Sequence, residues 1–216
     1  MEATFGMGIY TTSDVANILG LPLNKVSYWF SRYVSGTFEN YSKGKYFYDD
    51  NKHIAVNFYT LIETYVFYHL RSKGLKSKAI ITAHNILSRH YETPYPFALH
   101  SFLSSGTDLF HDFGSGDLVV LNETKQIAIK NIITQFAENI DFGERFAQKY
   151  YPKGRENSVV INPNNQFGAP IIEGTNIKTS TITSLIRGGE SIATVCNLYT
   201  ITEEQVRDVL DYSNAA

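Results

Sequence analysis

The chain has 216 residues, of which 43% are hydrophobic and 19% are charged, so it can build a core and is not a disordered chain. Its formal net charge of −2 argues against an overall basic nucleic-acid binder but allows a local basic patch. A single cysteine, no apolar run of membrane-spanning length and no basic-then-apolar leader predict a cytoplasmic protein without disulfides or a membrane span.

Two short helices begin the organised part of the chain. Thr12 or Ser13 is expected to cap a first helix through Leu19, and Gly20 is expected to end it. Pro22 suits the first turn of a second helix. Two short helices joined by a glycine turn are the layout of a helix-turn-helix.

The second of these helices and a hairpin predicted over residues 41–48 are the candidate DNA-contacting elements. The predicted DNA-binding residues are Thr12, Asn24, Lys25, Ser27, Tyr28, Arg32, Lys43 and Lys45. Residues 1–52 hold five basic and five acidic side chains, a net charge of zero, whereas strong DNA binders neutralise phosphates. A purely structural or dimerising role for these helices is therefore the alternative.

The start of the chain carries matches to a known pattern at Tyr10-Thr11, Val15-Ala16, Leu19-Gly20, Val26 and Tyr28-Trp29. With these residues it resembles the winged helix-turn-helix of the MerR type. The resemblance implies binding to operator DNA. Helix-turn-helix proteins commonly pair to match two half-sites about 34 Å apart, so a homodimer is also expected.

An apolar helix is predicted over residues 58–69 and a second, amphipathic helix over residues 77–89. From Thr64 to Tyr91 there are five basic side chains and no acidic one. This block either meets DNA phosphates beside the wing or is an ordinary solvated face.

The middle of the chain changes character. Three short strands separated by Gly/Ser turns are predicted within residues 97–122, followed by a helix over 125–140. Residues 151–157 have the composition of a linker. The predicted domains are 1–92 with the helix-turn-helix, 93–156 with a small antiparallel sheet, and 157–216.

The C-terminal residues predict a hairpin and three helices. The hairpin arms are residues 168–172 and 176–179. Ser180, Thr181 or Thr183 is expected to cap the first helix, Ser191 the second and Thr202 the third. The expected fold is therefore mainly α, in the α+β class.

This C-terminal stretch matches a second pattern at many positions. The matching residues are Asn162-Pro163, Gly168, Pro170, Ile172, Gly174-Thr175, Ile177, Gly189-Glu190-Ser191, Tyr199, Ile201-Thr202, Gln205-Val206, Leu210 and Tyr212. It resembles the antitoxin-associated domain of unknown function 433. Together with the MerR-like start, the layout resembles the longer VapB-type antitoxins. That resemblance implies a PIN-like ribonuclease toxin as partner and repression of the protein's own promoter.

The C-terminal domain is acidic, with seven acidic and three basic side chains from Glu156 onward. A net charge of −4 suits a basic protein partner better than DNA. The predicted partner-binding residues are Gly168, Pro170, Ile171, Ile172, Gly174, Thr175 and Ile177. The alternative is that the middle sheet contacts the toxin and the C-terminal helices form the dimer.

No zinc, dinucleotide, Walker or nucleophile-elbow motif is present in the sequence, so no enzyme activity, cofactor or metal is expected. The main alternative function is a stand-alone MerR-like transcription regulator whose aromatic middle forms a ligand pocket. A third alternative is an enzyme that uses His100, Asp108 and His111.

Overall fold

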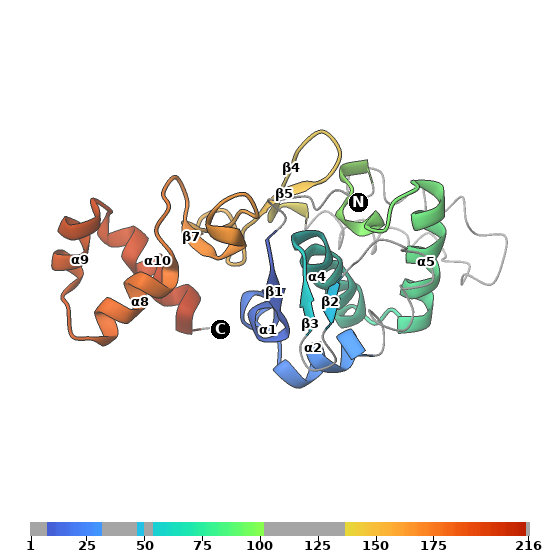
Figure 1. The fold of residues 1–216 in the computed structure, drawn as a ribbon, viewed down its shortest axis with the longest axis horizontal. Helices are drawn as coiled ribbons and strands as arrows, with labels where there is room; N and C mark the ends of the chain where they lie inside the picture. Colours follow the sequence, from blue (N-terminus) through green and yellow to red (C-terminus); the bar gives the residue numbers. More distant parts are fainter. Residues whose placement is uncertain (1–7, 32–46, 50–53, 102–136, 215–216) are drawn as a thin grey trace.

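The computed structural model describes residues 8–31, 47–49, 54–101 and 137–214, and Figure 1 shows a mixed α+β fold. The first group of elements is β1 Tyr10–Thr11, α1 Thr12–Leu19, α2 Leu23–Trp29, β2 Phe47–Asp49, β3 Ile54–Val56, α4 Phe58–Ser72, α5 Ser77–His90 and the 3-10 turn η2 Pro96–Ala98. The second group is β4 Ile140–Phe142, β5 Ala147–Tyr150, β6 Val159–Ile161, the 3-10 turn η3 Gln166–Gly168, β7 Pro170–Ile172, α8 Thr179–Arg187, α9 Ile192–Tyr199 and α10 Glu203–Asn214.

The first helix begins where its cap can be satisfied from both sides. The Thr11 hydroxyl accepts a hydrogen bond from the backbone N–H of Asp14 at 3.2 Å, and the Asp14 carboxylate accepts one from the Thr11 N–H at 2.8 Å. This capping box makes Thr11 the cap, so the prediction of Thr12 or Ser13 was wrong by one or two residues. Gly20 ends α1 in the left-handed conformation, as predicted.

A three-stranded antiparallel sheet in the order β1-β3-β2 lies beside these helices. Residues 41–46 of the predicted hairpin lie outside the described residues. The described strand β2 pairs with β3, with Tyr48 opposite Ala55. Two short helices and a small sheet are therefore present, whereas the specific MerR-like arrangement stays a prediction.

Helix α4 is the centre of the larger core, as its apolar sequence predicted. The Asn57 side chain caps it by accepting a hydrogen bond from the Thr60 N–H at 2.9 Å. Phe58, Leu61, Ile62 and Val66 are completely buried. Helix α4 runs to Ser72, three residues beyond the predicted end.

The middle of the chain differs from the prediction where it is described. Residues 97–103 were expected to be a strand, but Phe97 and Ala98 lie in η2 and donate their backbone N–H groups to the Glu63 carboxyl at 2.7 and 3.2 Å. A helix-borne acceptor thus replaces the strand partner. Residues 102–136, which hold the rest of the predicted strands and most of the predicted helix over 125–140, lie outside the described residues.

A second antiparallel sheet has the order β4-β5-β6-β7. The predicted linker at residues 151–157 consists of turns between β5 and β6, and these two strands pair through Tyr150 and Ile161. The sheet thus continues across the predicted domain boundary.

The C-terminal hairpin and helices form where the sequence predicted them. Ile172 donates to the carbonyl of Ile177 at 3.0 Å, although the returning arm pairs with β7 only through a bridge at Lys178. Helices α8, α9 and α10 enclose a separate apolar cluster that includes Ile182, Val195 and Val206. Figure 1 shows them at the opposite end of the molecule from α5.

Two of the three predicted helix caps are confirmed. The Ser191 hydroxyl accepts from the Thr194 N–H at 3.0 Å, and Thr202 and Gln205 exchange two hydrogen bonds of a capping box. Helix α8 instead begins at Thr179 with Lys178 at the cap position and no side-chain cap bond, so the prediction of Ser180, Thr181 or Thr183 was wrong.

The two groups of elements meet at an aromatic joint. Tyr150 of β5 packs against Tyr65 of α4 with ring centroids 4.8 Å apart. Tyr10 is 2% exposed, and the side of Gly168 from which a Cβ would project faces its hydroxyl. A residue at the start of the chain thus packs on the glycine of the C-terminal segment.

We expect Gly168→Ala to destabilise the protein by roughly 3 kcal/mol. Gly168 has φ +84°, where an L residue costs about 1–2 kcal/mol, and a Cβ there would also overlap the Tyr10 hydroxyl. Gly174→Ala is the matched control, since its φ is +75° but nothing lies within 4 Å of its added Cβ. Equal losses for the two variants in urea unfolding would contradict this role of the Tyr10 contact.

Candidate functional site

The exposed side of α2 carries the predicted DNA-contacting side chains. Asn24, Lys25, Ser27 and Tyr28 are exposed, whereas Val26 and Phe30 are fully buried. This alternation follows the helical period, with the apolar residues facing the core. Thr12, on α1, is half-buried, and Arg32, Lys43 and Lys45 lie outside the described residues.

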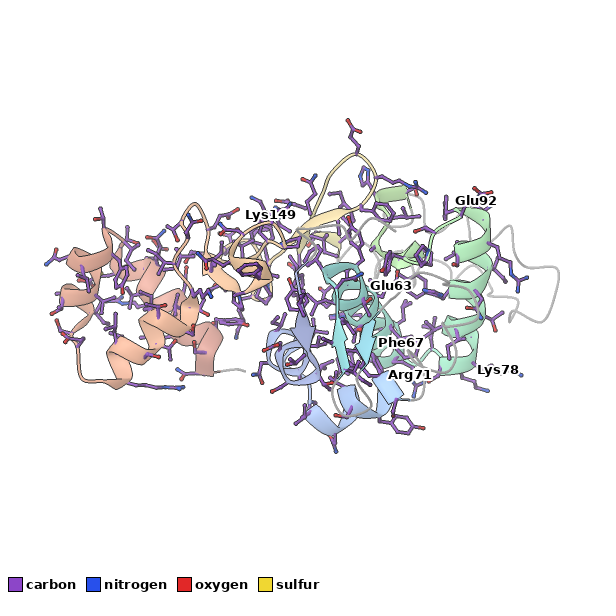
Figure 2. All side chains as sticks on the ribbon, viewed as in Figure 1. Glu63, Phe67, Arg71, Lys78, Glu92 and Lys149 are labelled. Carbon is purple, nitrogen blue, oxygen red and sulfur yellow. The ribbon has the colours of Figure 1, made fainter. Side chains whose placement is uncertain are left out.

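Helix α2 is fixed to the C-terminal half of α4 by Trp29. The Trp29 ring meets Phe67 edge-on at 4.3 Å between centroids and lies 6.1 Å from Tyr68. Arg71 is one helical turn beyond Phe67 and on the same side of α4. The end of α4 is therefore next to α2, and Figure 2 shows Phe67 and Arg71 there.

The turn from α4 to α5 brings four cationic side chains to the surface beside α2. We call this set the basic turn. Its members are Arg71, Lys73, Lys76 and Lys78, all of them exposed. The Arg71 guanidinium donates to the Leu75 carbonyl at 2.6 Å, which ties the two ends of the turn together.

No acidic side chain offsets this charge along the chain between Glu63 and Glu92. Glu63 is buried, and Figure 2 shows Glu92 at the far end of α5 from Lys78. Helix α5 also starts at the basic turn without a side-chain cap, so its first N–H groups add partial positive charge. The chain thus presents a local positive surface despite its net negative charge.

His69 does not add to this positive charge at neutral pH. Burial lowers the pKa of His69 below its ordinary value, and the nearby Lys73 lowers it further. The ring nitrogen Nδ1 lies 3.1 Å from the Tyr65 carbonyl oxygen within the same helix. The positive potential of this region therefore comes from lysine and arginine side chains.

The predicted partner-binding residues occupy different environments. Gly168, Ile171 and Ile172 are buried within the chain. Pro170, Thr175 and Ile177 are half-buried, and Gly174 is exposed. Partner binding by this hairpin stays a prediction, and the buried isoleucines serve the fold.

A polar cluster next to this hairpin was not predicted from the sequence. Arg155 contacts Asp141 at 2.6 Å, Lys149 contacts Glu173 at 2.9 Å, and the Tyr151 hydroxyl lies 2.9 and 2.8 Å from the two carboxylates. Burial raises the pKa of Asp141, but hydrogen bonds from Arg155 and Tyr151 outweigh it and leave this pKa below its ordinary value. These residues come from five separate points in the sequence, so only the fold shows that they meet.

The residues of the enzymatic alternative do not form a described site. The His100 ring stacks on Phe142 with centroids 5.2 Å apart, while Asp108 and His111 lie outside the described residues. Across the described residues, no three His, Cys, Asp or Glu side chains are grouped so that they could hold a metal ion. No helix in the described ranges is long and apolar enough to cross a membrane.

Comparison with known proteins agrees with the C-terminal pattern. Residues 159–213 match the model of the family described as protein of unknown function DUF433. This range contains the hairpin and helices α8 to α10.

Similarity to one curated protein extends over nearly the whole chain. The protein named "Putative antitoxin VapB45" from Mycobacterium tuberculosis is 22% identical over 237 residues, which cover 98% of this chain and 96% of that protein. The X-ray crystal structure of Rv2018 from Mycobacterium tuberculosis matches with a TM-score of 0.73 at 18% identity. The match covers 94% of this chain and 96% of that one, so the two chains share their fold from end to end.

Proposed function

We propose that this protein is the antitoxin of a type II toxin–antitoxin pair, which binds and inhibits a PIN-like ribonuclease toxin and represses its own operon. The observation that carries the proposal is the similarity to a protein named as an antitoxin over 98% of this chain. The match of residues 159–213 to a family model supports it at the C-terminal end. A regulatory protein of this kind has no catalytic site of its own.

The surface formed by the basic turn and the exposed side of α2 is the proposed operator-binding site. Lys25 and Tyr28 project from a short helix, and Lys73 and Lys76 extend the same region. Cations contribute most of the affinity for the DNA backbone, whereas polar side chains on a helix are suited to base edges. The protein would act as a homodimer, since paired helices match paired half-sites.

The proposed division of labour gives the first 92 residues to DNA and residues 157–216 to the toxin. The acidic composition of the C-terminal domain supports binding to a protein rather than to DNA. Removing residues 157–216 while retaining toxin binding would contradict this division and favour the middle of the chain as the contact.

The proposal is tested by growth. We expect expression of the neighbouring reading frame alone to arrest cells, and co-expression of this chain to restore growth and yield a complex that copurifies. Harmless expression of the neighbour, with no complex, would contradict the antitoxin function. It would favour the stand-alone transcription regulator.

A further inference from the structure

A groove of about 560 Å³ separates the start of the chain from the C-terminal helices. Ile9, Asn17 and Ile18 from β1 and α1 form one side. Residues 166–170 and helix α8 form the other, and Tyr212 of α10 closes the end. This volume falls in the range of roughly 300–1,000 Å³ that binding sites commonly have.

Two large apolar side chains stand exposed beside each other in this groove. Ile9 is 73% exposed and Phe167 is 84% exposed. Their backbones are joined, since the Ile9 N–H donates to the Phe167 carbonyl at 3.4 Å. Adjacent exposed apolar side chains in a groove are typical of a surface that a partner covers.

The backbone that presents Phe167 is strained. Gln166 has φ 49° and Phe167 has φ 57°, a left-handed conformation that disfavours side chains other than Asn, Asp and Gly. The exposed Phe167 ring gains little burial within the chain to offset this cost. A phenylalanine retained at a position that suits asparagine is therefore better explained by a contact outside the chain.

The charge of the groove differs from that of the domain around it. Lys178 and Arg187 line it, and neither forms an ion pair with another described residue. The carboxylate of Asp14, which also lines it, is engaged by the N–H and hydroxyl of Thr11 at 2.8 and 2.7 Å. The groove thus offers two cations inside a module that is acidic overall.

We propose that this groove docks a segment of the toxin that carries an aliphatic or aromatic side chain next to a carboxylate. The apolar side chain packs against Ile9 and Phe167, and the carboxylate pairs with Lys178 or Arg187. This inference rests on the proposed antitoxin function. It moves the contact from the buried residues of the hairpin to the groove beside them, and it selects an acidic segment within the partner.

The test compares groove variants of the full chain for binding to the purified product of the neighbouring reading frame. Phe167→Asn removes the ring but fits the left-handed backbone, and Arg187→Glu reverses one cation. We expect each to weaken binding at least tenfold, and Phe167→Asn to melt no lower than the unaltered chain. The controls are Leu198→Asn, which removes a side chain 65% exposed on α9, and Lys76→Glu in the basic turn. Both should bind the product normally.

The outcomes separate this inference from the function beneath it. If the unaltered chain does not bind the product, the antitoxin function and the docking site both fail. If the unaltered chain binds and the groove variants bind equally well, only the docking site is contradicted. If the groove variants keep toxin binding but lose self-association, the groove is occupied by a second copy, which also overturns the proposal.

Discussion

Replacing Lys73, Lys76 and Lys78 together by glutamate is expected to weaken binding to the protein's own upstream DNA by about a hundredfold or more at roughly 0.1 M salt. All three side chains are exposed on the basic turn beside α2. A phosphate that no lysine neutralises keeps its counterions, and each new carboxylate adds repulsion. The logarithmic salt dependence of binding should also become shallower by about 0.9 for each such phosphate. Fluorescence anisotropy over a salt series measures both quantities.

The matched control moves the same charge change to the C-terminal module. Lys153, Arg187 and Arg207 lie on this module, and replacing all three by glutamate alters the net charge equally. The two ion pairs disturbed, Lys153 with Asp211 and Arg207 with Glu203, are solvent-exposed and contribute little to stability. If both triple variants lose DNA affinity equally, overall charge rather than the basic turn governs binding.

Replacing Glu63 by alanine is expected to destabilise the protein by about 3–5 kcal/mol. The Glu63 carboxyl is buried in α4 and accepts from the backbone N–H groups of Phe97 and Ala98. Its second oxygen lies 2.9 Å from Nε2 of His84, which is 1% exposed. Alanine would leave these buried groups without their acceptor and would open a cavity as well.

Two further variants separate this loss from a general effect of removing a carboxylate. Glu63→Gln keeps an acceptor for the two N–H groups and should lose clearly less stability than Glu63→Ala. Glu204→Ala, on the exposed side of α10, should change the unfolding free energy by less than about 0.5 kcal/mol. Urea unfolding of the three variants gives the comparison. A Glu63→Ala effect as small as that of Glu204→Ala would contradict a structural role for Glu63.

Local sequence signals predicted the helices well, because each helix carries its own start and stop. Gly20, Ser191 and Thr202 act where they were expected to act. The cap of α1 shifted to Thr11 because only that residue can exchange hydrogen bonds with Asp14 three positions later. Helix α8 begins without any side-chain cap, so no residue type could mark its start.

Contacts between distant residues could not be predicted from one sequence. Glu63 lies in a helix whose apolar pattern gives no sign that its carboxyl replaces a strand partner for Phe97. Tyr10 and Gly168 belong to two different motifs, and only the fold brings them together. The groove follows from the same joint, since β1 and α1 form one of its sides and α8 the other.

The most direct test of the antitoxin function is a titration of ribonuclease activity. The purified product of the neighbouring reading frame is assayed on single-stranded RNA while this chain is added in increasing amounts. We predict that the product cleaves RNA by itself and that cleavage falls to background once this chain reaches stoichiometric amounts. A product that does not cleave, or one whose cleavage is unchanged by excess chain, would contradict the assignment as an antitoxin.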